Sequence, residues 1–348
     1  MFRSPLSIFS IVLLCLAIAG AEEQPSCQLL EGYRVCHKRG TLTEVVDEES
    51  SDHYLYIHYF NLTAIGENAF KNLSKTTTLS LGEGNKISAV TRDSFKGLEQ
   101  LEELHLDNNT IPLSANLFAE LKQLASLTLT FNKINKIPKD AFSGFTMLIS
   151  LHLDYNDLES IDKDAFSTLP TFATRLISLS NNKISNIETG ALSHLHQLRW
   201  LYLDNNKLTA IGSLTQGLQN LVELSLKNNQ LTGISKNDLK GLNELMGLYL
   251  EQNQIANIEE GAFADLVQMV HLDLKKNHLT QINGNLFRGM SKLQKLDLSE
   301  NQITVLKPDA FAGLPALKTL SLAGNKLTSV NRAELGLSDS ANLTVVLA

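Results

Sequence analysis

Cysteine is scarce in this chain of 348 residues, which contains only Cys15, Cys27 and Cys36. Cys27, Cys36 and the adjacent His37 match no zinc-binding spacing, so a structural zinc site is disfavoured. The sequence also lacks a glycine-rich phosphate loop and a nucleophile motif, which disfavours an enzyme. No segment at the carboxyl end is long and apolar enough for a membrane span or a lipid-anchor tail. We therefore expect no cofactor, no metal and no catalytic site.

Basic residues are outnumbered by acidic ones, 30 against 37, so the formal net charge is −7 at pH 7. Proteins that bind nucleic acid present a surplus of lysine and arginine to the phosphates. The deficit therefore disfavours nucleic acid as a partner.

The first 21 residues have the features of a secretory signal peptide. Arg3 is the only charged residue there, an apolar segment covers residues 8–18, and small residues follow it. The apolar segment is short for a membrane span, and cleavage after Ala19 or Ala21 fits the small-x-small rule. We therefore expect a secreted, extracellular protein that loses Cys15 with its signal peptide.

Cys27 and Cys36 are the only cysteines that remain after that cleavage. An even pair in a secreted chain predicts a disulfide. The two residues flank a hairpin-like stretch that contains Gly32. We therefore predict an amino-terminal cap over residues 22–50 that is closed by one disulfide.

Several asparagines stand in N-x-S/T sequons, and behind a signal peptide the exposed ones are expected to carry glycan. These asparagines are Asn61, Asn72, Asn108 and Asn342. The sequence therefore predicts a glycoprotein.

A leucine pattern repeats along most of the chain. Each unit has the form L-x-x-L-x-L-x-x-N-x-L, as in Leu101, Leu104, Leu106, Asn109 and Ile111. The asparagines recur at steps of 23 to 26 residues, at Asn85, Asn109, Asn132, Asn156, Asn182, Asn206, Asn229, Asn253, Asn277, Asn301 and Asn325.

This spacing predicts a solenoid. Apolar and polar residues alternate before each asparagine, as in a strand with one buried face. A single unit is too small to bury these apolar residues alone, so the units must stack on one another. We predict an α/β-type solenoid of about 12 coils over residues 51–348, a horseshoe with a parallel concave sheet and an irregular or short-helical convex side. The asparagine amides are expected to bridge backbone groups of adjacent coils, which is a structural role.

The repeats resemble the typical extracellular leucine-rich repeats of animal secreted proteins and receptor ectodomains, such as Toll-like receptors, Slit-type proteins and insect immune proteins. The resemblance implies protein or glycan binding on the concave face, often with dimerisation. The chain departs from many relatives in having two rather than four cysteines in its amino cap, no cysteine-containing carboxyl cap and no coiled coil. No motif marks a binding residue, so none is carried over.

The outward positions of the inner sheet can be read from the register, because residues two apart on a strand face the same way. Trp200, Tyr202 and Asp204 share one strand, and Tyr249 and His152 lie two coils away on either side. Aromatic side chains ringed by polar groups are typical of interface hot spots, although strand propensity alone also explains exposed aromatics. The predicted site on the concave face comprises His105, His152, Asp154, Trp200, Tyr202, Asp204 and Tyr249.

Charge divides the inner face. From the coil that contains Asn109 through the coil that contains Asn206, its rows contain acidic residues and no lysine, whereas later coils mix both signs. This acidic half either steers a basic partner or is simply a solvated face. Its acidic residues are Glu103, Asp107, Asp154 and Asp204.

Three breaks interrupt the repeat. Residues 82–84 add one residue before Asn85, residues 171–175 hold a two-residue excess, and the coil after Asn206 lacks the usual phenylalanine. Insertions in solenoids often map to binding loops, and neutral drift is the alternative.

The carboxyl end has an apolar last strand at Leu343, Val345 and Leu347. A bare strand edge invites pairing with another chain. The sequence leaves three interpretations open: a homodimer through this end, shielding by a glycan on Asn342, or a truncated gene product.

The sequence is compatible with three classes of function to different degrees. The leading hypothesis is a secreted, non-catalytic module that binds an extracellular protein or glycan in innate immunity or cell-surface signalling. The alternative is a structural component of extracellular matrix or adhesion. An enzyme is disfavoured because His105 and His152 would stand about 10 Å apart on an open sheet, at about 4.8 Å per coil.

Overall fold

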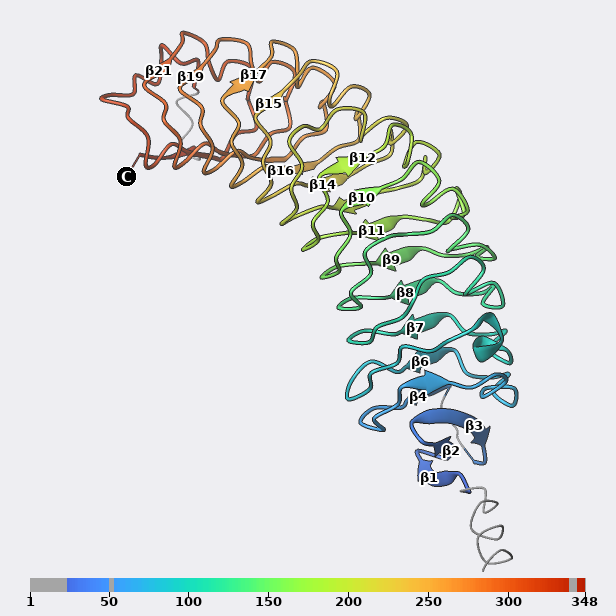
Figure 1. Ribbon diagram of the computed structural model, residues 1–348. Helices are drawn as coiled ribbons and strands as arrows, with labels where there is room; N and C mark the ends of the chain where they lie inside the picture. The colour runs from blue at the N-terminus through green and yellow to red at the C-terminus, as the bar shows by residue number, and fades with distance from the viewer. Residues whose placement is uncertain (1–23, 50–52, 338–342, 348) are drawn as a thin grey trace, which may run out of the picture.

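The computed structural model describes residues 24–49, 53–337 and 343–347. The predicted signal peptide with Cys15 and the sequon at Asn342 lie outside the described residues. The coils stack into a curved arch, with the amino-terminal cap at one end and the last strand at the other (Figure 1). Within the described part of the chain, no helix is long and apolar enough to cross a membrane.

A parallel sheet of 13 short strands lines the inside of the arch, as predicted. Each coil contributes one strand, whose central apolar residue points into the core. In spatial order the strands are β4 (Tyr54–Tyr56), β6 (Thr78–Ser80), β7 (Glu103–His105), β8 (Ser126–Thr128), β9 (Ser150–His152), β11 (Leu176–Ser178), β13 (Trp200–Tyr202), β14 (Glu223–Ser225), β16 (Gly247–Tyr249), β18 (His271–Asp273), β20 (Lys295–Asp297), β22 (Thr319–Ser321) and β23 (Thr344–Val346).

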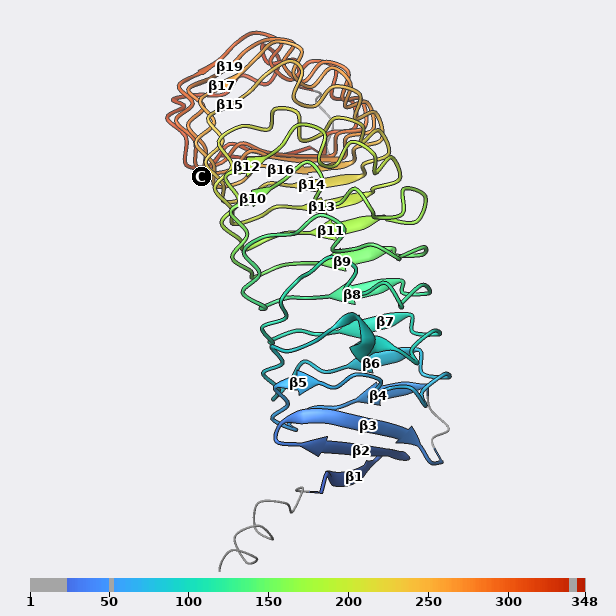
Figure 2. The same ribbon diagram turned by 45° about the vertical axis from the view of Figure 1, so that its right-hand side comes forward.

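Beyond the asparagine turn, pairs of coils form two-residue parallel bridges, seen to the left of the long sheet in Figure 2. The pairs are β10 (Ser160–Ile161) with β12 (Asn186–Ile187), β15 (Gly233–Ile234) with β17 (Asn257–Ile258), and β19 (Gln281–Ile282) with β21 (Val305–Leu306). The return path is built of turns, and its one helical element among the described residues is the 3-10 helix η1 (Arg92–Phe95). The convex side is therefore irregular rather than helical.

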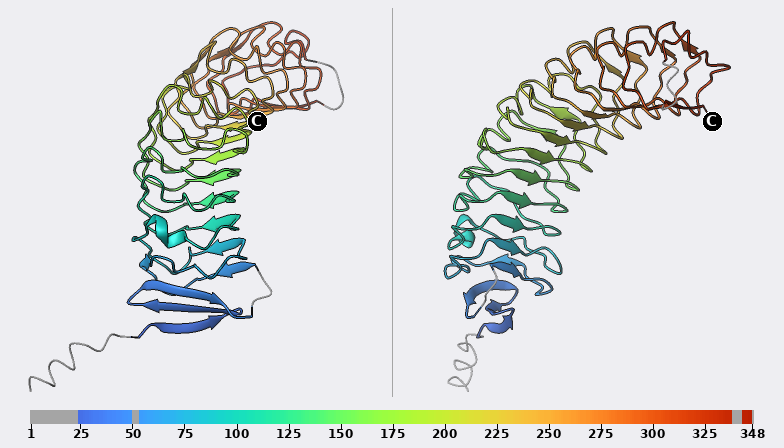
Figure 3. Two further views of the ribbon diagram at one scale, coloured as in Figure 1. Left: turned by 90° about the vertical axis from the view of Figure 1, so that its right-hand side faces the viewer. Right: turned by 180° about the vertical axis from the view of Figure 1, so that it is seen from behind.

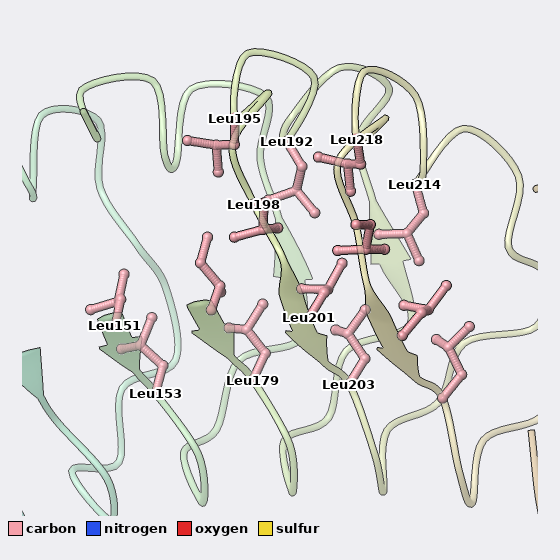
Figure 4. Close-up of a cluster of buried hydrophobic side chains, with 14 of the residues drawn as sticks. Leu151, Leu153, Leu179, Leu192, Leu195, Leu198, Leu201, Leu203, Leu214 and Leu218 are labelled. Atoms are coloured by element: carbon pink, nitrogen blue, oxygen red, sulfur yellow. The ribbon is translucent and has the colours of Figure 1, made fainter. Parts of the chain in front are cut away.

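Leucines from successive coils form one continuous core (Figure 4). Leu201 and Leu203 of one coil and Leu224 and Leu226 of the next are fully buried. On the convex side, phenylalanines stack between coils at about 6 Å, as for Phe263 and Phe287, whose ring centroids lie 6.1 Å apart. This stacking explains why each coil needs its neighbours: its phenylalanine and leucine side chains are covered partly by those of the adjacent coils.

Asn229 shows how the repeated asparagine works. Its Oδ1 accepts a hydrogen bond from the backbone N–H of Leu208 at 3.0 Å. Its Nδ2 donates to the carbonyl of Leu203 at 2.9 Å and to that of Leu226 at 3.1 Å. One buried side chain thus satisfies backbone groups of its own coil and of the coil before it, which confirms the predicted bridge.

The amino-terminal cap is a small sheet of β1 (Ser26–Leu30), β2 (Tyr33–Lys38), β3 (Thr41–Asp47) and β5 (Ala64–Ile65). Figure 3 shows it stacked beneath the first coil. Cys27 and Cys36 are opposite each other in the β1–β2 hairpin and form the predicted disulfide. Both sulfur atoms are therefore used in the disulfide.

The predicted last strand is present as β23, which pairs in parallel with β22. Leu343 is buried, whereas Leu347 is 52% exposed. Dimerisation through this end stays a prediction.

Candidate functional site

The inner-face register is the one that the sequence predicts. Trp200 pairs with Leu176 on one side and Glu223 on the other, and Tyr202 pairs with Ser178 and Ser225. Trp200 and Tyr202 both point away from the core and are half-buried among neighbouring side chains. Their strand, β13, stands near the middle of the long sheet.

Tyr202, Glu223 and Tyr249 form the centre of a polar aromatic cluster. Burial raises the pKa of Tyr202 to about 12, and the Glu223 carboxylate adds to the rise through its charge and a hydrogen bond. The pKa of Tyr249 is also raised, chiefly by burial and to a smaller extent by the negative charge of Glu223. Both phenols therefore stay protonated at neutral pH, and the Tyr202 hydroxyl donates its hydrogen bond to Glu223.

Gly247 allows Tyr249 to fold back along its own strand. A Cβ atom at Gly247 would lie 3.1 Å from Tyr249 Cε2 and 3.4 Å from Glu223 Cγ. Lys227 Nζ lies 4.6 Å from the centre of the Tyr249 ring, within cation–π range. The His271 ring meets the Tyr249 ring edge-on, with centroids 5.0 Å apart.

His271 is the least satisfied member of this cluster. Its Nε2 atom is buried and has no hydrogen-bond partner. Burial lowers the pKa of His271 below its usual 6.5, and the charges of Lys295 and Lys227 lower it further. The adjacent Asp273 carboxyl has a raised pKa, chiefly because of burial. A neutral, unpartnered imidazole nitrogen therefore lies against the aromatic ring.

Two acidic residues of the inner face, Asp154 and Asp204, form hydrogen bonds with the next coil. Asp204 Oδ1 accepts hydrogen bonds from the Ser225 hydroxyl at 2.5 Å and the Lys227 backbone N–H at 2.9 Å, both on the next coil. Asp154 Oδ1 likewise accepts hydrogen bonds from the Ser178 hydroxyl and the Ser180 N–H of the next coil. These carboxylates couple adjacent coils, which the sequence-based interpretation of free acidic charges had not anticipated.

The structure gathers only part of the predicted site. Trp200, Tyr202 and Asp204 lie on or just after β13, and Tyr249 lies on β16, two strands away, with Glu223 of β14 between them and acting on both tyrosines. His152 and Asp154 belong to the β9 coil, two strands from β13, and their side chains lie 4.0 Å apart. His105, on β7, lies four strands from β13 and faces Glu103 at 3.6 Å.

The prediction of the site missed Glu223, Lys227, His271 and Asp273. All four stand in the outward rows of the register, so their positions could be read from the sequence. Nothing in the spacing shows that Tyr249 folds toward them, because this depends on the missing side chain at Gly247.

The breaks in the repeat have visible consequences. In the insertion at 171–175, Phe172 is 86% exposed and its carbonyl accepts a hydrogen bond from Arg175 Nη1. In the coil that lacks a phenylalanine, Gly212, Thr215 and Gly217 line a convex hollow of about 550 Å³.

Two family models match the repeats. One, described as leucine rich repeat, matches residues 212–255, 243–303, 268–327 and 291–340. The other, described as a BspA type leucine rich repeat region, matches residues 63–198. The chain belongs to the leucine-rich repeat family.

Similar curated proteins include Toll-like receptor 3 of Bos taurus, 31% identical over 184 residues, which are 50% of this chain and 18% of that protein. Lumican of Gallus gallus is 36% identical over 178 residues, 50% of each chain. Biglycan of Xenopus laevis is 33% identical over 170 residues, 40% of this chain and 43% of the relative. The leucine-rich repeat chain thus spans half or less of the length of these relatives.

Solved structures agree on the fold. A leucine-rich repeat protein of Leptospira interrogans is 26% identical with a TM-score of 0.63, covering 84% of this chain and 77% of its own. Toll in its complex with Spätzle from Drosophila is 20% identical with a TM-score of 0.56, covering 81% of this chain and 45% of its own. The second likeness shows the fold alone.

The lowered pKa of His271 predicts a pH-dependent stability. As the pH falls below 6.5, the unfolded chain binds a proton at this residue before the folded chain does, so the free energy of unfolding falls. We expect His271→Gln to lose less stability than the native protein between about pH 7.5 and about pH 5.5. Urea unfolding at both pH values measures this, and equal losses in the two proteins would contradict it.

Proposed function

We propose that this protein is a secreted, non-catalytic binding module that recognises an extracellular protein or glycan on its inner face, in innate immunity or cell-surface signalling. One observation carries the proposal: Trp200, Tyr202, Glu223, Lys227 and Tyr249 together present large aromatic surface, hydrogen-bond donors and both signs of charge on adjacent strands. The cluster is larger than the packing of the coils requires, since the core lies on the other face of the sheet.

Such a cluster fits the chemistry of a binding hot spot. Aromatic anchors supply apolar contact, and partly dehydrated polar groups beside them supply orientation and specificity. The Tyr249 phenol suits hydroxyl or carbonyl groups of a ligand, and the Tyr202 phenol oxygen can accept a hydrogen bond from a ligand hydroxyl while its own O–H bonds to Glu223. Relatedness to Toll-like receptor 3 and lumican supports an extracellular role for the same kind of repeat.

Secretion and glycosylation are parts of this proposal. The three sequon asparagines within the described residues, Asn61, Asn72 and Asn108, are all exposed. We expect the protein to leave the cell with its chain starting after Ala19 or Ala21 and with glycan on at least one of the three. Intact-mass analysis before and after glycan removal checks this. Retention of residues 1–21 in the protein from the medium, or a glycan-free mass, would contradict it.

The ligand-binding prediction concerns Trp200 and Tyr249. Affinity capture from extracellular fluid supplies a partner, and Trp200→Ala and Tyr249→Ala should each weaken its binding by about thirtyfold, or about 2 kcal/mol. The melting temperature should change little, because neither side chain lies in the coil core.

Phe172→Ala is the matched control, since it removes an exposed aromatic ring outside the inner-face rows and should leave the affinity unchanged. Large losses of stability with unchanged affinity for Trp200→Ala and Tyr249→Ala would show that these rings serve packing instead. Self-assembly of the protein without any captured partner would favour the structural alternative.

A further inference from the structure

A second hollow, of about 370 Å³, opens on the inner face at the amino-terminal end of the sheet, over β4, β6 and β7. It is lined by aromatic and acidic side chains, among them Tyr56, His58, Glu83, Asp107 and Phe131. The hollow lies on different coils from the cluster around Tyr249.

Two carboxylates in this hollow are held in place by hydrogen bonds. Glu83 Oε2 accepts a hydrogen bond from the Tyr59 hydroxyl at 2.8 Å. Asp107 Oδ1 accepts one from the Thr130 hydroxyl at 2.5 Å and one from the Thr130 N–H at 3.2 Å. Within the described part of the chain, neither carboxylate forms an ion pair with lysine or arginine. Each therefore has a second oxygen available to a ligand.

The insertion at 82–84 places Glu83 in the hollow. Gly84 has a φ of +68°, and a Cβ atom there would lie 2.4 Å from the Tyr59 ring. Only glycine allows Tyr59 to lie against this turn and bond to Glu83. The extra residue thus serves the geometry of the hollow rather than the core.

Phe131 forms an aromatic wall of the hollow, and its backbone adopts a conformation that is unfavourable for a bulky residue. It occupies a left-handed backbone position with a φ of 55°, as does Tyr155 with 54°. The equivalent positions of other coils hold Asn181 and Asn205 and also the unbranched Gln252, Lys276 and Glu300, but no other aromatic residue among those coils. Bulky side chains disfavour this conformation, and asparagine tolerates it. The two rings stack with centroids 4.3 Å apart yet remain 48% and 49% exposed. Strain combined with exposure points to function, because the fold gains little from it.

We propose that this hollow receives an arginine side chain from a basic segment of a protein partner. The planar guanidinium can bond to the free oxygens of Glu83 and Asp107 while its face covers the Phe131 ring. The formal net charge of −7 attracts such a segment from a distance. This site goes beyond the proposed function, since it works without the Trp200 cluster.

Asn108 also lines the hollow and stands in a sequon with Thr110. A glycan there would stand beside the opening. The test therefore uses the full chain with Thr110→Ala, which removes the sequon, while the Thr110 hydroxyl makes only a 3.4 Å bond to Ile87 O.

The probe is a fluorescein-labelled peptide in which arginines alternate with glycine and serine, and its binding is measured by fluorescence anisotropy. Phe131→Asn and Glu83→Gln should each weaken binding by about tenfold. Phe131→Asn should keep or raise the melting temperature, because asparagine suits the left-handed backbone. The lysine version of the peptide should bind more weakly.

Glu244→Gln is the matched control, because it removes the same charge at an exposed position near β16. It should leave the affinity unchanged, and so should Trp200→Ala. Equal weakening by Glu83→Gln and Glu244→Gln would show general charge attraction only and overturn the proposal. So would an absence of peptide binding, or unchanged binding by Phe131→Asn with a lowered melting temperature.

Discussion

The buried asparagine amide is the interaction on which the rest of this structure depends. A coil of about 24 residues leaves backbone N–H and C=O groups at each turn without a partner in its own coil. The amide of Asn229 satisfies groups at Leu203 and Leu208 of the preceding coil and at Leu226 of its own. The same arrangement at each asparagine holds the coils in register and keeps the inner sheet parallel.

The fixed register of the strands brings side chains of different coils together on the inner face, where they can either bind a ligand or stabilise the fold. Side chains from strands far apart in the sequence become neighbours, so Tyr202, Glu223 and Tyr249 can form one cluster. The same closeness allows Asp154 and Asp204 to bond to the next coil, and so they contribute to stability as well as to surface charge. A polar residue on this face is therefore a binding residue only when its hydrogen-bonding groups are not already used.

Two places on the inner face retain unused groups. His271 Nε2 is buried without a partner beside Tyr249. Glu83 and Asp107 line a hollow beside the strained ring of Phe131, and no lysine or arginine of the described residues pairs with them. In both places a glycine, Gly247 or Gly84, makes room for a tyrosine ring that the core does not need. A buried polar atom without a partner and a strained backbone both disfavour folding, and such features are typical of functional surfaces.

The fold could be predicted because every coil must bury its leucines and pair its backbone groups through its asparagine, and both requirements recur at a fixed spacing in the sequence. The rows of outward residues followed from the same register, which is why Trp200, Tyr202 and Tyr249 were identified correctly as inner-face residues. Their contacts could not be predicted, since these depend on rotamers and on neighbouring coils. Nothing in the pattern revealed that Phe131 and Tyr155 stack, although aromatic residues where other coils have asparagine were a readable signal.

The most direct test of this account compares Asn229→Ala with Gln230→Ala by chemical denaturation. Asn229→Ala should lower the free energy of unfolding by about 1–3 kcal/mol, because it leaves buried backbone groups without partners. Gln230→Ala, at the adjacent exposed position, should change it by less than about 0.5 kcal/mol. Equal, small effects of the two substitutions would contradict the central role of the asparagine bridge.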